Sequence, residues 1–357
     1  MLLERGLFMK IKIALLDREK SYLTRMVTAF GAKYSDKLEI YSFTDPVVAL
    51  DTVKNARIDV LLASDQFDVN PQNLPNRCAF AYMVDSMGFD TLKDQYAICK
   101  FQKAELIYKQ ILSIYSEKAT SISGFAVNGN ESMVIAFCTA GGGNESGSMA
   151  VACATNLAAK GKKVLYLNLE KFGSSDTYFS GAGQFDMSDI IFALKSKKTN
   201  LHLKLESCVK QDACGVHFYS QSKIALDMME MNTEDILHLL STLKLMGGYD
   251  YIVLSIDCAL DREMLKIYRQ FQAIIMVSDG SHECNTKTER AYAALSILEQ
   301  NADAPLTDRT YLVYEKNAGK ADQLLDLPSL KVLGGLPRYP GANVYQVVEK
   351  LERKGYI

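Results

Sequence analysis

The sequence has 357 residues, enough for two domains that each bury a sizeable core. Its 40 lysines and arginines against 42 aspartates and glutamates give a net charge of −2, which does not suggest the basic face of a nucleic-acid-binding protein, so no nucleic-acid partner is expected. The eight cysteines form no C-x-x-C pair and only four histidines are present, so we expect a cytoplasmic protein without disulfides or a protein-ligated metal centre. No apolar run approaches the roughly 20 residues of a membrane span, so no integral membrane segment is expected.

Residues 1–9 are predicted to be an N-terminal extension, too short and too charged for a signal peptide. From residue 10 onward, apolar runs alternate with helical patterns. Leu23, Met26, Val27 and Phe30 show the spacing of one buried helix face. The predicted strands are 10–17, 38–43, 58–63, 79–84 and 96–99, and the predicted helices include 46–53 and 105–115. Five strands alternating with helices predict a flavodoxin-like α/β domain over residues 10–116.

This first domain resembles the receiver domain of response regulators in element order and in the residues at strand ends. Asp17 matches one acid after the first strand, but Arg18 replaces the second. Ser64 occupies the phospho-acceptor position, and Lys100 matches the lysine after the fifth strand. The resemblance therefore implies an atypical receiver domain that has lost aspartyl phosphorylation and acts as a protein-binding module.

One alternative stays open for this domain. A slip of the third strand by one residue would place Asp65 at the phospho-acceptor position. After the domain, residues 117–130 are small, polar and glycine-bearing, which indicates a linker.

The second domain, residues 131–357, begins with a pattern typical of a βαβ unit that binds phosphate. A strand is predicted over 133–138, a glycine-rich turn over 139–148, a small-residue helix over 149–159 and a strand over 163–170. Backbone N–H groups of such a turn and the positive end of the helix dipole favour an anion at the same place. A tight turn that binds nothing is the simpler alternative.

This unit resembles the deviant Walker A region of MinD/ParA ATPases, and the resemblance implies that the domain binds ATP with Mg²⁺. It places Gly141 at the signature lysine, Ser146 at the phosphate-binding lysine, and Gly147 and Ser148 at the two hydroxyl positions. The implied nucleotide-binding residues of the loop are Gly141, Gly142, Gly143, Asn144, Glu145, Ser146, Gly147, Ser148 and Met149. A second register, from Gly142 to Gly147, would put Ser148 and Met149 on the lysine and hydroxyl positions instead.

The departures from this motif bear on catalysis. Both lysines are absent, and Glu145 adds a negative charge where a phosphate would approach. The backbone amides and the helix dipole that remain are sufficient for binding but weaken the case for hydrolysis.

Later strands carry further parts of the resemblance. Glu170 matches the acid that polarises the attacking water, while Asn168 replaces its partner. In a Walker B-like strand, Ser255 replaces the aspartate, and Asp257 two residues on is the substitute. Ser148 and Asp257 are thus the implied Mg²⁺ ligands.

Two segments near the C-terminus resemble the adenine-binding parts of these ATPases. Glu315 stands in the place of an asparagine, and Leu336, Pro337 and Arg338 resemble a turn that flanks the base. Before these two segments, and after the Walker B-like strand, a helix that ends at Leu298 carries Lys287 and Arg290 on a face predicted to be solvated. The final apolar stripe from Val344 to Leu351 is interpreted as a packed terminal helix, with a membrane-targeting tail as the alternative.

A degenerate receiver ahead of a deviant ATPase is the arrangement of TadZ/CpaE-like pilus assembly proteins, which the chain resembles over nearly its whole length. The predicted fold is therefore two doubly wound α/β sheets, a flavodoxin-like receiver domain followed by a MinD/ParA-type P-loop NTPase domain. The resemblance implies a homodimer that binds pilus or secretion assembly proteins through the receiver-like domain. These partners could place the protein at a cell pole or peripherally at the membrane. A slow but active ATPase and a nucleotide-free scaffold are the alternatives.

Overall fold

The computed structural model describes residues 10–88, 90–119, 132–142, 145–197, 200–299, 305–315, 325, 327 and 329–336. The N-terminal extension, most of the predicted linker and the terminal helix lie outside these residues. By contacts the chain divides into two compact units. The first comprises Met1–Val127, Gly183–Phe185 and Phe192–Cys208, and the second comprises Asn128–Ala182, Asp186–Ile191 and Val209–Ile357. The domain boundaries predicted from the sequence, residues 10–116 and 131–357, stay a prediction.

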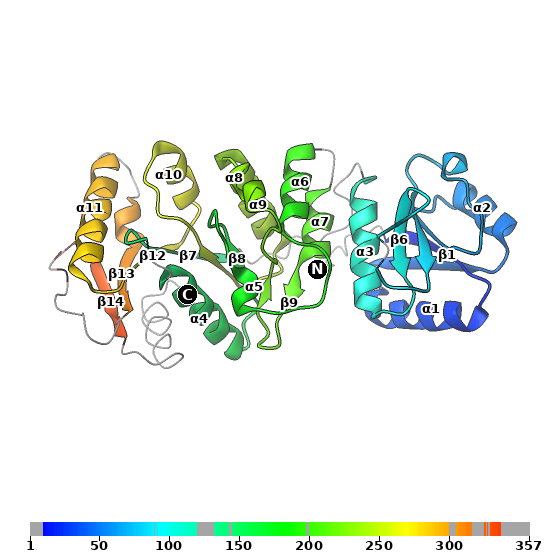
Figure 1. Ribbon diagram of the computed structural model, residues 1–357, viewed down its shortest axis with the longest axis horizontal. Helices are drawn as coiled ribbons and strands as arrows, with labels where there is room; N and C mark the ends of the chain where they lie inside the picture. Colours follow the sequence, from blue (N-terminus) through cyan, green and yellow to red (C-terminus); the bar gives the residue numbers. More distant parts are fainter. Residues whose placement is uncertain are drawn as a thin grey trace, which may run out of the picture. The chain divides into compact units, whose positions relative to one another are not determined.

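The first unit is built on a sheet in the order β2-β1-β3-β4-β6-β5, parallel except for the β5–β6 pair (Figure 1). Its strands are β1 (Ile11–Leu16), β2 (Leu38–Phe43), β3 (Val60–Ser64), β4 (Ala79–Val84), β5 (Thr91–Leu92) and β6 (Gln95–Cys99). Its helices are α1 (Lys20–Tyr34), α2 (Pro46–Asn55), η1 (Pro71–Asn73), α3 (Ala104–Ser116) and α7 (Leu201–Cys208). The predicted α/β fold class is confirmed, with the short β5 as an addition.

Alternation along β1 explains how this sheet is covered on both faces. Ile13 and Leu15 belong to a core cluster that also contains residues of α1 and α3. Ala14 and Leu16 belong to a second cluster on the α2 side. A strand buried on both faces reads as a continuous apolar run, as the sequence of β1 does.

Helix α7 packs against α3 although nearly a hundred residues separate them in the sequence. The Tyr108 hydroxyl donates to Glu206 at 3.0 Å, and the Lys204 ammonium donates to the Ser113 hydroxyl at 2.9 Å. Lys204 is buried, so its charged group requires such a partner.

The second unit has a sheet in the order β14-β13-β12-β7-β11-β8-β10-β9, in which only β9 runs antiparallel (Figure 1). Its strands are β7 (Met133–Cys138), β8 (Val164–Asn168), β9 (Lys210–Gln211), β10 (His217–Phe218), β11 (Tyr251–Ser255), β12 (Ala273–Ser278), β13 (Thr310–Glu315) and β14 (Lys331–Leu336). Its helices are α4 (Glu145–Ala159), α5 (Ser175–Tyr178), α8 (Ala225–Met229), α9 (Thr233–Met246), α10 (Arg262–Tyr268), α11 (His282–Leu298) and η2 (Leu306–Arg309), while α6 (Met187–Ser196) crosses the division between the units.

Strand β7 is central in this sheet, between β11 and β12. Because the strands around it are parallel, the segments that follow β7, β8, β11, β12 and β13 all leave the same edge of the sheet. Ligands of open α/β sheets bind at this edge. Helix α4 packs its small residues against the sheet, and its Ala150 and Ala154 are fully buried.

Two local predictions differ from the structure. Helix α4 begins at Glu145, so Ser146, Gly147 and Ser148 lie in its first turn and not in the preceding loop. Residues up to Leu336 belong to strand β14, where Leu336 pairs with Glu315, and not to a turn. Pro337 and Arg338 lie outside the described residues.

Candidate functional site

The loop after β7 is held against α11. A Cβ atom added at Gly141 would lie 2.4 Å from the Cys284 sulfur, so this position has no room for a side chain. Gly142 has a φ of +86°, a conformation that favours glycine. Gly143 and Asn144, and the side chain of Glu145, lie outside the described residues. Packing at Gly141 and backbone conformation at Gly142 thus favour glycine, whatever the loop binds.

The first turn of α4 brings two hydroxyl groups to the sheet edge. Ser146, at the position of the phosphate-binding lysine, is buried, and Met149 packs into the core. Ser148 is half-buried and its hydroxyl lies 3.5 Å from Glu315 Oε2 at the end of β13. Two of the predicted site residues, from the loop motif and from the base-binding motif, are therefore brought together.

Glu170 lies beside the same turn. A Cβ atom added at Gly147 would lie 3.9 Å from Glu170 Oε1, 3.9 Å from the Ser255 hydroxyl and 3.6 Å from the Tyr178 hydroxyl. Ser255 donates a hydrogen bond to Glu170 Oε1. Asn168 Oδ1 accepts from the Glu170 backbone N–H at 2.9 Å. The residues at the ends of β8 and β11 thus fix the Glu170 carboxylate close to the start of α4.

The pKa values of two tyrosines, Tyr178 and Tyr166, are affected by the negative charge of Glu170. Burial raises the pKa of Tyr178, and the carboxylates of Glu170 and Glu315 raise it further. Burial also raises the pKa of Tyr166, with Glu170 as the next cause. Both phenols therefore stay neutral near pH 7, and Tyr178 lies within the field of both carboxylates.

Asp257, the second predicted Mg²⁺ ligand, is turned toward the loop after β8. Its Oδ2 atom accepts from the Lys171 backbone N–H at 2.9 Å, while Ser148 faces Glu315. In the part of the chain that the structure describes, no group of three or more His, Cys, Asp or Glu side chains is placed to hold a metal ion. Mg²⁺ prefers oxygen ligands and needs few from the protein when phosphates supply the others. The Ser148 hydroxyl and the carboxylates of Glu170 and Glu315 are of the chemical type that such an ion requires.

A lysine that sequence reasoning placed on a solvated face reaches the loop. Lys287 Nζ lies 3.4 Å from the Gly141 carbonyl oxygen, and it is paired with Glu283 at 2.7 Å. The position of Lys287 follows from the order of the strands. Because β12 neighbours β7, the helix after β12 begins beside the loop after β7.

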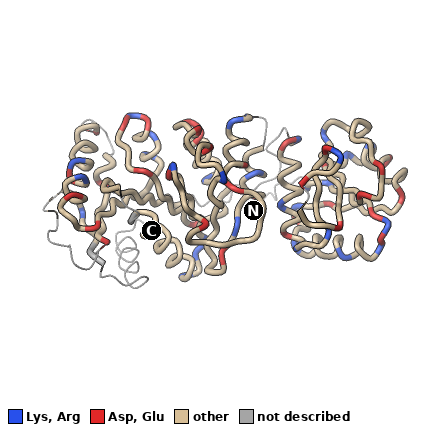
Figure 2. Tube along the Cα trace, in the orientation of Figure 1, with Lys and Arg blue, Asp and Glu red and all other residues tan. Residues whose placement is uncertain are grey.

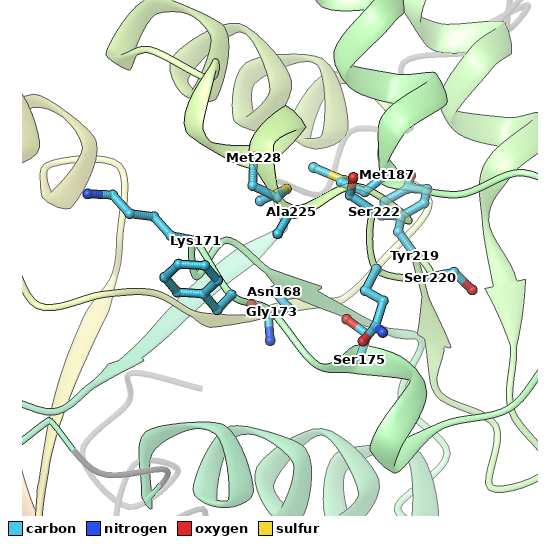
Figure 3. A pocket seen from close by; sticks show the side chains of 12 residues that line it. Asn168, Lys171, Gly173, Ser175, Met187, Tyr219, Ser220, Ser222, Ala225 and Met228 are labelled. Atoms are coloured by element: carbon cyan, nitrogen blue, oxygen red, sulfur yellow. The ribbon is translucent and has the colours of Figure 1, made fainter.

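A small cavity beside the end of β8 is not large enough for a nucleotide. It measures about 40 Å³ and lies between the loop after β8 and α8 (Figure 3). Asn168 and Gly173 line one side, and Ala225 and Met228 line the other. Ligand pockets usually measure roughly 300–1,000 Å³. A nucleotide would therefore not fit in this cavity.

In the first unit, Lys100 joins the three polar side chains at the ends of β1, β3 and β4. Its Nζ atom lies 2.8 Å from Asp17 Oδ2, 3.1 Å from Asp85 Oδ1 and 3.2 Å from the Ser64 hydroxyl. Burial opposes the charge on Lys100, but the hydrogen bonds and charges of Asp17 and Asp85 outweigh it and raise the pKa.

The third strand keeps the register that puts Ser64 at its end. Ser64 pairs with Met83 of β4, and Asp65 is exposed just beyond the strand. The Arg18 guanidinium lies 5.5 Å from the Phe67 ring centre. Lys100 thus links Asp17, the matched acid of the first strand, with Ser64 at the phospho-acceptor position.

Comparisons with known proteins agree with the predicted resemblance. Residues 9–116 match the family model described as the TadZ-like receiver domain, which confirms the resemblance to TadZ and CpaE proteins that the sequence indicates. Curated proteins gave no match. Within the described residues no helix is both long and apolar enough to cross a bilayer.

Among solved structures, the chain is similar to three nucleotide-associated proteins of low sequence identity. A ParA family ATPase from Chlorobium tepidum is 19% identical, with 62% of this chain and 93% of that chain covered and a TM-score of 0.45. MinD from Pyrococcus horikoshii, solved with Mg-ADP, is 14% identical over 63% and 97%, with a TM-score of 0.48. A plasmid partition protein from Borrelia burgdorferi, bound to AMPPNP, is 13% identical over 63% and 99%, with a TM-score of 0.41.

Proposed function

Because residues 9–116 belong to the TadZ-like receiver-domain family, we propose that the chain is an ATP-binding localisation or assembly factor of a Tad-type (type IV) pilus or secretion system. It acts as a nucleotide-associated homodimer with weak or no hydrolysis. The observation that carries the nucleotide part is the contact of Lys287 with the glycine loop, at 3.4 Å from the Gly141 carbonyl.

Lys287 supplies a charge that the loop itself does not have. Residues 139–148 contain no lysine or arginine, whereas a bound triphosphate carries several negative charges. The pKa of Lys287 is raised by the hydrogen bond and charge of Glu283, so the amine is protonated at neutral pH. The pair with Glu283 is exposed, and exposed ion pairs are weak. The lysine can therefore leave Glu283 for a phosphate oxygen.

The rest of the cradle comes from the backbone. Helix α4 is 15 residues long, and its N-terminal end carries roughly half a positive charge. Glu170 and Glu315 lie beside it and would repel a bare nucleotide, but they favour one that carries Mg²⁺. Bound Mg²⁺ would supply the charge neutralisation that lysines usually provide, with Ser148 and these carboxylates as its nearest protein oxygens.

Hydrolysis is weak or lost because the loop holds Gly141 and Ser146 where this kind of site carries lysines. Loss of one preorganised donor near a reacting centre costs about 10²–10³ in rate. Glu170 is nevertheless held next to the start of α4 by Ser255, which favours a slow residual activity as the second candidate function.

Partner binding is assigned to the receiver-like unit. Ser64 stands at its phospho-acceptor position and accepts a hydrogen bond from Lys100, so aspartyl phosphorylation is not the signal that this unit reads. Association with partners there would place a cytoplasmic protein at a cell pole or at the membrane.

Calorimetric titration of the full chain with ATP and MgCl₂ tests the proposal, with Lys287→Ala beside Lys266→Ala. Lys266 is a matched control, since it is also exposed and paired with a glutamate, Glu263 at 2.6 Å. We expect saturable binding that Lys287→Ala weakens about ten-fold and Lys266→Ala leaves unchanged. Absence of binding by the wild-type chain would refute the nucleotide function, and equal binding by the two variants would refute the role of Lys287.

A further inference from the structure

A groove of about 300 Å³ opens on the second unit between the end of β11, the segment from α8 to α9, and α10. We call it the methionine groove. It is lined by Leu169, Lys171, Met228, Met231, Asn232, Thr233, Ile236, Ile256, Asp257, Ala259, Asp261, Glu263, Met264 and Ile267. It is distinct from the small cavity of Figure 3, with which it shares Lys171 and Met228.

The floor and one wall of the groove are apolar. Met228 and Met231 come from the segment from α8 to α9 and Met264 comes from α10, and each is only partly buried. Two further apolar residues of α8 are exposed, Leu226 at 67% and Met229 at 46%. Partly exposed apolar residues gathered in one groove mark an interaction site, and methionines adapt their shape to different partners.

The rim of the groove is acidic. Asp257, Asp261 and Glu263 are exposed lining residues, and Figure 2 shows acidic residues on the segment around α10. Asp261 caps α10 by accepting from the Met264 N–H at 2.8 Å, and Glu263 pairs with Lys266 at 2.6 Å. Among the lining residues, Lys171 is the single base, and its ammonium points away from the neighbouring cavity in Figure 3.

We propose that the methionine groove binds a basic amphipathic helix of a partner protein. An apolar helix face fits between Met228, Met231 and Met264, and lysines or arginines flanking that face meet Asp261 and Asp257. The charge argues against an anionic lipid surface, which this rim would repel. The inference does not depend on nucleotide binding, because no residue of the glycine loop lines the groove.

The test uses the full chain and a fluorescein-labelled peptide of about five helical turns, with leucines on one face and lysines on the other. A second peptide carries glutamates in place of the lysines. Fluorescence anisotropy measures both affinities. We expect the basic peptide to bind at least about ten-fold more tightly than the acidic one, with a preference that falls as salt rises.

Two sets of variants separate the groove from the rest of the surface. Met228→Ser with Met231→Ser removes apolar contacts and is expected to weaken binding about ten-fold. Asp261→Asn with Glu263→Gln keeps the helix cap and removes two charges, and is expected to weaken the basic peptide alone. Met87→Ser is the control, since Met87 is 71% exposed on the first unit.

Three results would overturn the inference. The first is equal affinity for the two peptides. The second is an unchanged affinity in both groove variants while the protein remains folded by circular dichroism. The third is a different occupant: binding to phosphatidylglycerol vesicles, or a dimer seen by sedimentation, that the groove variants abolish while peptide binding persists.

Discussion

The Ser255 hydroxyl donates a hydrogen bond to the Glu170 carboxylate and so joins the ends of two neighbouring strands, β11 and β8. At the position where a Walker B-like strand would carry an aspartate, the chain therefore has a hydrogen-bond donor that orients another acid. Glu170 is fixed beside the first turn of α4, which is where the proposed nucleotide site would place a phosphate and its attacking water.

Glu170→Gln tests this role. The amide keeps an oxygen that can accept from Ser255, but it cannot take up a proton, so ATP turnover should fall at least about ten-fold. Mg·ATP affinity should fall less than turnover, because Glu315 and Ser148 still offer oxygens to the Mg²⁺. A phosphate-release assay in large enzyme excess measures the first quantity, and calorimetry measures the second. Glu263→Gln, an exposed acid on α10, serves as the control. Turnover that Glu170→Gln leaves unchanged would remove Glu170 from the chemistry.

Gly141→Ala tests the packing of the loop on α11. The new methyl group would lie 2.4 Å from the Cys284 sulfur, and overpacking of this kind costs about 1–3 kcal/mol. Cys284→Ala in the same chain removes the sulfur and should restore part of that loss. Thermal unfolding of the two single variants and the double variant measures the coupling, and additive effects would show that the loop and α11 are not in this contact.

Lys100→Met tests the buried ion pair of Lys100 with Asp17. Asp17 is 2% exposed, and loss of its partner would leave a buried charge unpaired, at a cost of about 3–5 kcal/mol. Adding Asp17→Asn should recover most of this stability. The exposed Lys93–Asp68 pair at 3.1 Å in the same unit is the control, and Lys93→Met should change little. Urea unfolding measures all of these, and a small effect of Lys100→Met would mean that the ion pair does not stabilise the unit.

His202 on α7 is expected to make the stability of the fold depend on pH. Burial lowers its pKa below the usual value, with a further lowering by Lys37, although Glu206 opposes this. The unfolded chain therefore binds more protons than the folded one just below pH 6.5, so this contribution to stability is present above that pH and is lost as the pH falls. His202→Gln should reduce the decline in urea midpoint between neutral and mildly acidic pH. An unaltered decline would exclude His202 as its cause.

Much of the fold follows from local patterns in the sequence. The apolar runs of β1 and β7 are buried strands because only a covered parallel sheet accepts such runs. The glycine loop and α4 follow from spacing alone. The start of α4 lies four residues before the predicted one, because Ser146, Gly147 and Ser148 are typical of a loop as well as of a helical first turn.

What the sequence could not indicate are contacts between distant segments. Residues 192–208 group with the first unit through α7 and α3, and no periodicity along either helix specifies the other as its partner. Lys287 looks like any exposed helical lysine until the strand order places α11 beside the loop. The acidic surroundings of α4 arise in the same way, since Glu170 and Glu315 come from strands far apart in the chain.

The most direct measurement is calorimetric titration of the full chain with ATP in the presence of MgCl₂ and, separately, of EDTA. We expect saturable binding with Mg²⁺ and an affinity at least about ten-fold lower without it, because two carboxylates lie where the phosphates would approach. Absence of heat at millimolar ATP and Mg²⁺, with the protein folded, would contradict nucleotide binding by this loop.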